Sequence, residues 1–224
     1  MALTLLSTTL LAWVALAALP TARAVLGVDV SQPASPAAAA CLKAAGYSFA
    51  IPRAWESVGR FDASAPGSVA SFWGAEFDHV DVYMFPCSGR NATRQVRELR
   101  GNLTAAGVRF GMLWLDIEYN PDAACAWAAD KAANCAFLGE LAAAAAAEGF
   151  NTGVYTSVHE YSLFFDLTCT VASHLPLWYP HYEAPPQPNF DDFTPFAGWA
   201  KPAIKQFNDK GPSCGVGVDV SFYP

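Results

Sequence analysis

Short apolar runs alternate with longer stretches of helical pattern along most of the chain. Beyond a first apolar stretch near Met1, eight runs have the length and composition of buried strands. Eight strands in one chain are the number that a small closed barrel requires. The predicted strands span 26–30, 47–51, 79–85, 110–117, 151–156, 175–179, 203–207 and 216–220.

Helical segments are predicted between the first six strands. The clearest is the fourth, because its second half is nearly all alanine and Gly149 follows as a stop. In the third, Asn91 is a suitable N-cap residue and Gly107 closes the helix. The predicted helices span 35–45, 66–76, 91–106, 127–148 and 158–166.

The helical pattern stops after residue 175. The connection 180–202 is rich in proline and aromatic residues, and 208–215 is predicted to be a short loop. Five strand–helix units followed by three strands indicate an α/β fold, a modified TIM-like (β/α)5(β)3 barrel with mainly parallel strands. No linker divides residues 25–224, so we expect a single domain.

The first residues have the pattern of a signal peptide. An apolar stretch from Leu3 to Leu19 precedes the small-residue site Ala22-Arg23-Ala24. A membrane anchor is the alternative, but the stretch is short for a span and carries Ser and Thr. We therefore expect cleavage after residue 24, a mature chain that begins near Val25, and no stable membrane insertion after cleavage.

Composition narrows the class of protein. Apolar residues make up 53% of the chain and charged residues 15%, which is typical of a globular domain with a large core. Without Arg23, the chain keeps 12 basic and 20 acidic residues, a net charge of −8. This balance argues against nucleic acid or an anionic membrane as a partner. We expect a monomer.

All six cysteines lie after residue 24, and an even number in a secreted chain predicts up to three disulfides. Fifteen pairings are possible, and the spacing does not choose among them. A metal site would need closely spaced ligand pairs, but the nearest cysteines are ten residues apart and the four histidines form no such pair. We expect neither metal nor cofactor. Asn91 and Asn102 stand in glycosylation sequons.

Four carboxylates fall where predicted strands end: Asp29, Asp116, Glu118 and Asp219. In a parallel barrel these ends carry the catalytic residues. Asp116 and Glu118 are two residues apart on one strand, so they share a face, with Cα atoms about 6–7 Å apart. Two carboxyl groups at this range suit glycoside hydrolysis, in which one donates a proton and the other stays ionised.

Aromatic residues near the same ends support a sugar site. Tyr83 and Trp178 are candidates for contact with a pyranose face, although an aromatic side chain at a strand end is more often part of the core. Trp114 shares the face of Asp116, and its role stays open at this stage.

Several motifs together resemble glycoside hydrolase family 25, the Chalaropsis-type lysozymes, and especially the branch found in amoebae, slime moulds and nematodes. They cover residues 25–224 in order and are specific as a set. They are Gly-Val-Asp29-Val-Ser-Gln, Val-Asp-Val-Tyr83-Met-Phe-Pro-Cys, Trp-Leu-Asp116-Ile-Glu118, Gly-Val-Tyr155-Thr-Ser, Pro-Leu-Trp178-Tyr, Lys-Pro-Ala-Ile-Lys-Gln206 and Gly-Val-Gly-Val-Asp219.

The resemblance implies hydrolysis of the β-1,4 bond between N-acetylmuramic acid and N-acetylglucosamine in bacterial peptidoglycan, without metal or organic cofactor. Glu118 matches the general acid and Asp116 its partner. Asp29 and Asp219 match further acids of the cleft, and Tyr83, Trp178, Tyr155 and Gln206 are assigned to substrate binding. Whether Asp116 attacks the sugar or orients the substrate's acetamido group stays open; adjacent acids on one strand favour the second.

One departure from the family pattern and several alternatives stay open. Glu183 stands where relatives more often carry Asp, which puts a contact at the cleft edge in doubt. The chain could also be a catalytically silent wall-binding barrel, a metal-dependent deacetylase or a hydrolase of a related polymer such as chitin. We expect secretion or delivery to a lysosome-like vacuole, and the acidic balance suggests work at low pH.

Overall fold

The computed structural model describes residues 24–224, and the expected signal peptide 1–24 lies outside them except for Ala24. Five helices and ten strands form in this part of the chain. The helices are α1 (Pro36–Ala44), α2 (Ala65–Gly74), α3 (Ala92–Ala105), α4 (Lys131–Ala147) and α5 (Val158–Phe164). The strands are β1 (Val25–Val30), β2 (Phe49–Glu56), β3 (Arg60–Phe61), β4 (His79–Val80), β5 (Val82–Met84), β6 (Met112–Asp116), β7 (Asn151–Tyr155), β8 (Leu177–Pro180), β9 (Ile204–Ser213) and β10 (Val216–Tyr223).

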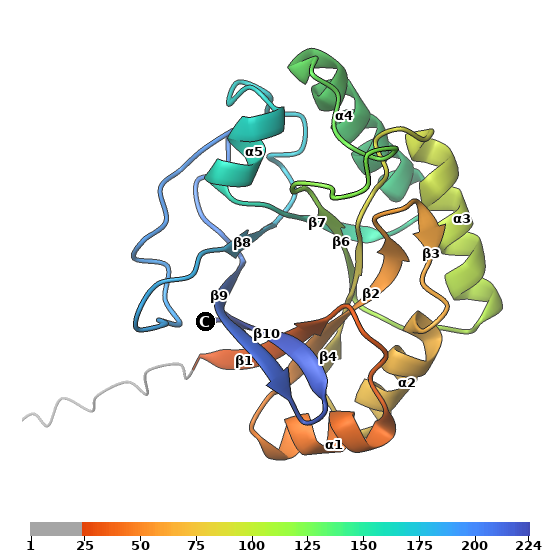
Figure 1. The fold of residues 1–224 in the computed structure, drawn as a ribbon, viewed down its shortest axis with the longest axis vertical. Coiled ribbons are helices and arrows are strands. Elements are labelled where there is room, and N and C mark those ends of the chain that lie inside the picture. The colour runs from red at the N-terminus through yellow and green to blue at the C-terminus, as the bar shows by residue number, and fades with distance from the viewer. Residues whose placement is uncertain (1–23) are drawn as a thin grey trace, which may run out of the picture.

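The strands close into an eight-stranded barrel, which confirms the predicted fold class (Figure 1). Around the barrel the order is β1, β10, β9, β8, β7, β6, β5 and β2, and β2 closes on β1. The short β4 pairs with β2 just before β5 does, so β4 and β5 occupy the same position in the barrel. β3 forms an outer hairpin with β2. Adjacent strands of the barrel are parallel except at β10, which is antiparallel to both β1 and β9.

Local capping explains where the helices begin. Side chains of Ser35, Asn91, Asp130 and Ser157 accept hydrogen bonds from backbone N–H groups in the first turns of α1, α3, α4 and α5. The helix predicted from residue 127 therefore starts at Lys131, because Asp130 is its cap. The other four predicted helices are confirmed to within two residues at each end.

Three strand predictions need correction. β2 continues past residue 51 to Glu56, because β5 and β3 supply hydrogen-bonding partners on its far half. The predicted strand 79–85 is interrupted at Asp81, whose carboxylate accepts hydrogen bonds from the Met112 N–H and the Trp114 indole. The predicted loop 208–215 is wrong: most of it belongs to β9, which pairs with β10 as a hairpin.

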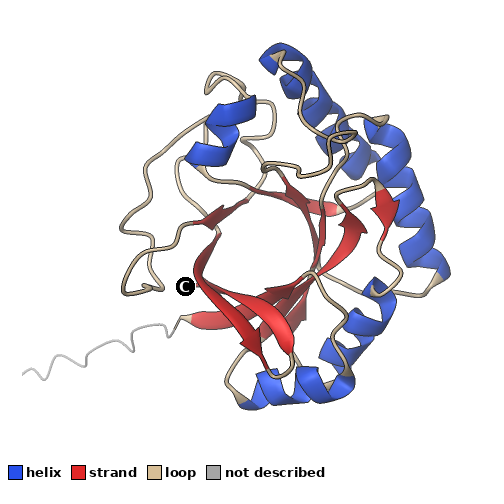
Figure 2. Ribbon diagram, in the orientation of Figure 1, coloured by secondary structure: helices blue, strands red, loops and turns tan. Residues whose placement is uncertain are grey.

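Helices cover one side of the barrel, and the long connection between β8 and β9 covers the other (Figure 2). That connection contributes aromatic residues to the outer core, including Phe196 and Trp199. A second apolar cluster fills the barrel interior: Phe49, Ile51, Trp114, Tyr155, Trp178 and Ile204. Trp114, whose role the sequence left open, is thus part of the barrel filling.

The six cysteines form three disulfides. Cys41–Cys214 ties α1 to the tip of the β9–β10 hairpin, and Cys87–Cys125 joins the loops after β5 and β6. Cys135–Cys169 joins α4 to the segment after α5. Among residues 24–224, no helix combines the length and apolarity needed to cross a bilayer.

Candidate active site

A cavity of about 460 Å³ opens where the parallel strands end, the position at which barrel enzymes carry their active sites. All eight residues that the sequence singled out line it, although they come from seven different strands and the segment after β6. These residues are Asp29, Tyr83, Asp116, Glu118, Tyr155, Trp178, Gln206 and Asp219.

Asp29 and Asp219 face each other across β1 and β10. They are direct partners in the register of this antiparallel pair. The expectation that Asp219 ends the last strand is wrong, since β10 continues to Tyr223. Because β10 is antiparallel to the other strands of the barrel, its first half lies at the same end of the barrel as the carboxyl ends of the parallel strands. The two acids are neighbours for this reason.

Asp116 is the last residue of β6 and Glu118 lies two residues further on, with buried Ile117 between them. The backbone around Glu118 is held by side chains. Its carbonyl accepts a 2.7 Å hydrogen bond from the Trp127 indole, and the N–H of the next residue, Tyr119, donates to Glu160 at 2.8 Å. The peptide unit that follows Glu118 is therefore held at both its carbonyl and its N–H, although this segment has left the sheet.

Burial raises the pKa of each of the four carboxyl groups, and neighbouring acids add to the effect. The pKa values of Asp116 and Asp29 lie well above the usual range, Asp116 through burial and then Glu118, Asp29 through burial and then Asp219. Burial, Glu160 and Asp219 raise the pKa of Glu118 to about 7. Burial and Asp209 raise that of Asp219 to about 6.

A hydrogen-bonded chain crosses the cavity from β7 to β1. The Tyr155 hydroxyl donates to Gln206 Oε1 at 2.8 Å, and Gln206 Nε2 donates to Asp29 Oδ2 at 2.9 Å. The hydroxyl of Tyr182, from the connection after β8, reaches the same Gln206 oxygen. These contacts fix the orientation of the Gln206 amide. Sequence reasoning did not single out Tyr182, because only the fold brings that connection over the barrel mouth.

The two aromatic candidates differ in how much surface they offer to the cavity. Trp178 is almost fully buried; its indole donates to Ser221 Oγ at 3.0 Å and meets the Tyr155 ring edge-on, with centroids 4.6 Å apart. It forms the floor of the cavity. Tyr83 is half-buried and pairs in register with Arg53 of β2.

Glu183 lies in an ion pair. Its carboxylate accepts a 3.0 Å hydrogen bond from the ammonium group of Lys205, a fully buried side chain on β9. The same ammonium lies 2.9 Å from Asp192. Glu183 is not among the residues that line the cavity, and it ties the connection after β8 to the barrel wall.

Two residues that shape the site escaped the sequence analysis: Arg53, which lines the cavity, and Glu160, which bonds to the residue after Glu118. Arg53 seemed to lie in a loop, because the predicted strand ended at residue 51. Glu160 carried no signal beyond its place three residues after the helix cap Ser157. Within residues 24–224, no group of three His, Cys, Asp or Glu side chains is arranged to hold a metal ion.

The chain is similar to known proteins over nearly its whole length. A family model described as "Lysozyme-like protein 1" matches residues 20–207. "Probable GH family 25 lysozyme 2" of Dictyostelium discoideum is 42% identical over 202 residues, which are 90% of this chain and 92% of the relative. "Lysozyme-like protein 5" of Caenorhabditis elegans is 36% identical, over 88% of this chain and 91% of its own.

The fold has a counterpart among solved structures. The bacterial lysozyme from Streptomyces coelicolor superposes with a TM-score of 0.70 and 20% identity, over 91% of this chain and 93% of that one. This likeness confirms the fold, and the sequence relatives confirm the family that the motifs indicated: the chain belongs to glycoside hydrolase family 25.

Proposed function

We propose that this protein is a lysozyme that hydrolyses the β-1,4 bond between N-acetylmuramic acid and N-acetylglucosamine in bacterial peptidoglycan. The observation that carries the proposal is the Asp116/Glu118 pair at the end of β6, inside a cavity where burial and neighbouring acids raise the pKa of Glu118 to about 7. The family membership supports the same reaction.

Glu118 is the general acid in this proposal. Burial first, and then Glu160 and Asp219, raise its pKa to about 7, so below that pH it holds the proton that the leaving oxygen needs. Its carboxyl is accessible from the cavity, whereas its backbone is held by Trp127 and Glu160.

Asp116 acts on the substrate's acetamido group. It lies on the same side of the chain as Glu118 and is almost fully buried, and its Oδ1 atom accepts no hydrogen bond from residues 24–224. A buried oxygen without a donor is suited to accept a hydrogen bond from the N–H of the acetamido group. The carbonyl oxygen of the same acetamido group then attacks the anomeric carbon. Strong inhibition by a thiazoline analogue of the resulting cyclic intermediate is the expected result, and a covalent glycosyl–Asp116 adduct would contradict it.

The remaining cavity residues bind sugar. Asp29, Asp219 and Gln206 provide oxygens and an amide for hydroxyl groups, and Tyr155 keeps the Gln206 amide in place. Tyr83 and Trp178 provide the apolar faces against which the C–H face of a pyranose packs.

The decisive experiment compares wild type with Glu118→Gln on bacterial walls. Clearing of a wall suspension should fall by about 100-fold or more in the variant, the usual contribution of a general acid. Glu98→Gln is the matched control, because Glu98 is an exposed partner of Arg94 on α3, away from the cavity. Equal clearing by wild type and Glu118→Gln would overturn the assignment.

Analysis of the products identifies the bond. New reducing ends on N-acetylmuramic acid are expected, whereas reducing ends on N-acetylglucosamine alone, or cleavage of chitin but not of walls, would contradict the proposed substrate. Full activity after treatment with a strong chelator is expected, since the proposed steps use carboxyl groups alone.

We also propose that the enzyme is a monomer that is exported after removal of residues 1–24, to the outside or to a lysosome-like vacuole. The three disulfides support an oxidising compartment, and the acidic balance argues against nucleic acid and anionic membranes. Cell fractionation with N-terminal sequencing of the mature chain tests the destination and the cleavage site together.

A further inference from the structure

The cavity is lined by four acids and one basic side chain. Asp29, Asp116, Glu118 and Asp219 are the acids, and Arg53 is the one basic residue among the described residues that line it. Neither the proton transfer nor the acetamido contact proposed above uses this guanidinium.

The sheet directs Arg53 into the barrel mouth. It stands two residues after Ile51, whose side chain is part of the barrel filling, so both side chains lie on the inner face of β2. Its neighbour in register on β5 is Tyr83, another cavity residue. Arg53 is half-buried, and its charge is therefore less screened than that of a surface arginine.

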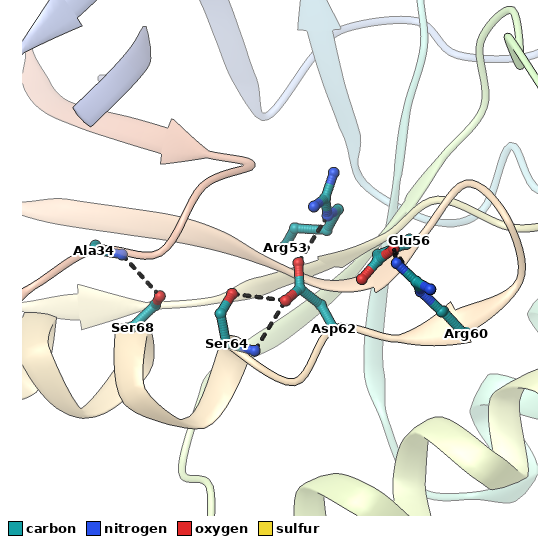
Figure 3. Close-up of polar contacts among 7 residues, drawn as sticks. All are labelled: Ala34, Arg53, Glu56, Arg60, Asp62, Ser64 and Ser68. Carbon is teal, nitrogen blue, oxygen red and sulfur yellow. Dashed lines mark hydrogen bonds and ion pairs between the residues drawn. The ribbon is translucent and has the colours of Figure 1, made fainter.

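One edge of the guanidinium is already held. Arg53 Nε donates to Asp62 Oδ2 at 2.9 Å, and Asp62 Oδ1 accepts hydrogen bonds from the N–H and hydroxyl of Ser64 (Figure 3). Burial would raise the pKa of Asp62, but the hydrogen bonds from Ser64 and Arg53 outweigh it and hold the pKa below its usual range. Asp62 therefore stays ionised and keeps Arg53 in place.

The other end of the guanidinium is available to a ligand. Neither Nη nitrogen donates a hydrogen bond within residues 24–224, and the end of the guanidinium that carries them extends beyond its contact with Asp62 (Figure 3). Arg53 does not neutralise the catalytic pair either. Its charge is the weakest of the main influences on Asp116, whose pKa remains raised. A fixed planar fork of N–H donors at a cavity wall is a receptor for a carboxylate or carbonyl group.

We propose that Arg53 binds the 3-O-lactyl group of N-acetylmuramic acid and thereby selects wall glycan over chitin. The inference rests on the proposed function. The two polymers share their backbone and acetamido groups, and the lactyl ether is the difference between them. The lactyl group ends in a carboxylate in glycan chains without stem peptides, and in an amide carbonyl where a peptide is attached. Both present oxygen to the guanidinium fork.

Binding to an inactive enzyme tests the inference. In a Glu118→Gln background, calorimetry measures the affinity for muramic-acid-containing oligomers without stem peptides and for chitin oligomers of equal length. Adding Arg53→Gln should lower the affinity for the muramic-acid-containing oligomer about tenfold to a hundredfold, the usual contribution of a hydrogen bond to a charged group. Affinity for the chitin oligomer should change little. Arg53→Lys should fall between, because it keeps the charge and loses the fork.

Controls separate recognition from folding. Arg60→Gln removes a neighbouring arginine, which is exposed and paired with Glu56, and should leave both affinities unchanged. Arg53→Gln with Asp62→Asn removes the pair together and should show the same selectivity change with a smaller loss of thermal stability. Oligomers that carry a stem peptide measure the amide-carbonyl contact separately and should lose less affinity, because the acceptor is neutral.

The outcomes distinguish the two proposals. An equal loss of affinity for both oligomers, or no loss for either, would overturn the role of Arg53 while leaving the lysozyme assignment intact. If the Glu118→Gln enzyme bound neither oligomer and wild type cleaved neither polymer, the proposed function itself would fail.

Discussion

Glu160 accepts a 2.8 Å hydrogen bond from the backbone N–H of Tyr119, the residue directly after Glu118. Glu160 lies in the first turn of α5, three residues after the cap Ser157, where a glutamate often bonds back to the cap residue. Here it reaches instead to the segment that carries the proposed acid. The same contact brings a negative charge close enough to raise the pKa of Glu118.

Glu160→Gln should therefore shift the pH profile. The amide can still accept from Tyr119, but the negative charge is gone, so the pKa of Glu118 falls below about 7. Since a general acid works below its pKa, the alkaline limb of kcat/KM should move to lower pH, with a several-fold loss of rate at pH 7 and little change at pH 5. Glu140→Gln, on the exposed face of α4, is the control. An unchanged alkaline limb would contradict this prediction.

Asp219→Asn should stabilise the fold at neutral pH and weaken activity. The pKa of Asp219 is raised by burial and Asp209 to about 6, above the unfolded value of about 3.9, so ionisation costs the folded state stability as pH rises through this window. The variant avoids that cost. Its Tm should exceed that of wild type by a few degrees at pH 7.5, and the difference should vanish near pH 3.5. A gain that persists at pH 3.5 would point to packing instead.

Lys205→Met should destabilise the protein by about 3–5 kcal/mol, the usual cost of breaking a buried ion pair from one side. Lys205 is fully buried, and its loss leaves Glu183 and Asp192 without their cation. Urea unfolding measures the effect. Adding Glu183→Gln and Asp192→Asn to the same variant should recover most of the loss, because no buried charge is then left unpaired. Failure to recover would show that lysine packing matters more than its charge.

Gly153→Ala should destabilise by about 1–3 kcal/mol, as over-packing of a core does. A Cβ atom at this position of β7 would lie 2.2 Å from the Trp114 ring, which is held by Asp81 and cannot move freely. Gly67→Ala in α2 is the matched control, since nothing lies within 4 Å of its added Cβ. That control should be neutral or slightly stabilising. Equal melting temperatures for the two variants would argue against a close contact between Gly153 and Trp114.

Much of the fold could be predicted without coordinates, because each element carries its own signal. The barrel strands were predicted from apolar runs of strand length, and the helices in part from residues such as Asn91 and Ser157 at their starts. Both are local features of the sequence. The shared face of Asp116 and Glu118 is equally local, since a strand repeats every two residues. The motif set indicated the family, and with it a (β/α)5(β)3 barrel.

Other features depend on partners far away in the chain. Residues 208–213 are strand only because β10 pairs with them, and β2 extends to Arg53 only because β5 and β3 lie beside it. The disulfide pairing depends on which loops the closed barrel brings within reach. None of these partners can be read from local periodicity.

The sequence by itself determined the barrel, the family and the acidic pair on β6, because these follow from local pattern and from motifs. Only the tertiary structure decided that Asp219 faces Asp29 through an antiparallel strand, that Glu160 supports Glu118, and that Arg53 faces the cavity. The physical reason is that pKa shifts and cavity walls arise from groups distant in sequence, which only closure of the barrel places within a few ångströms of one another.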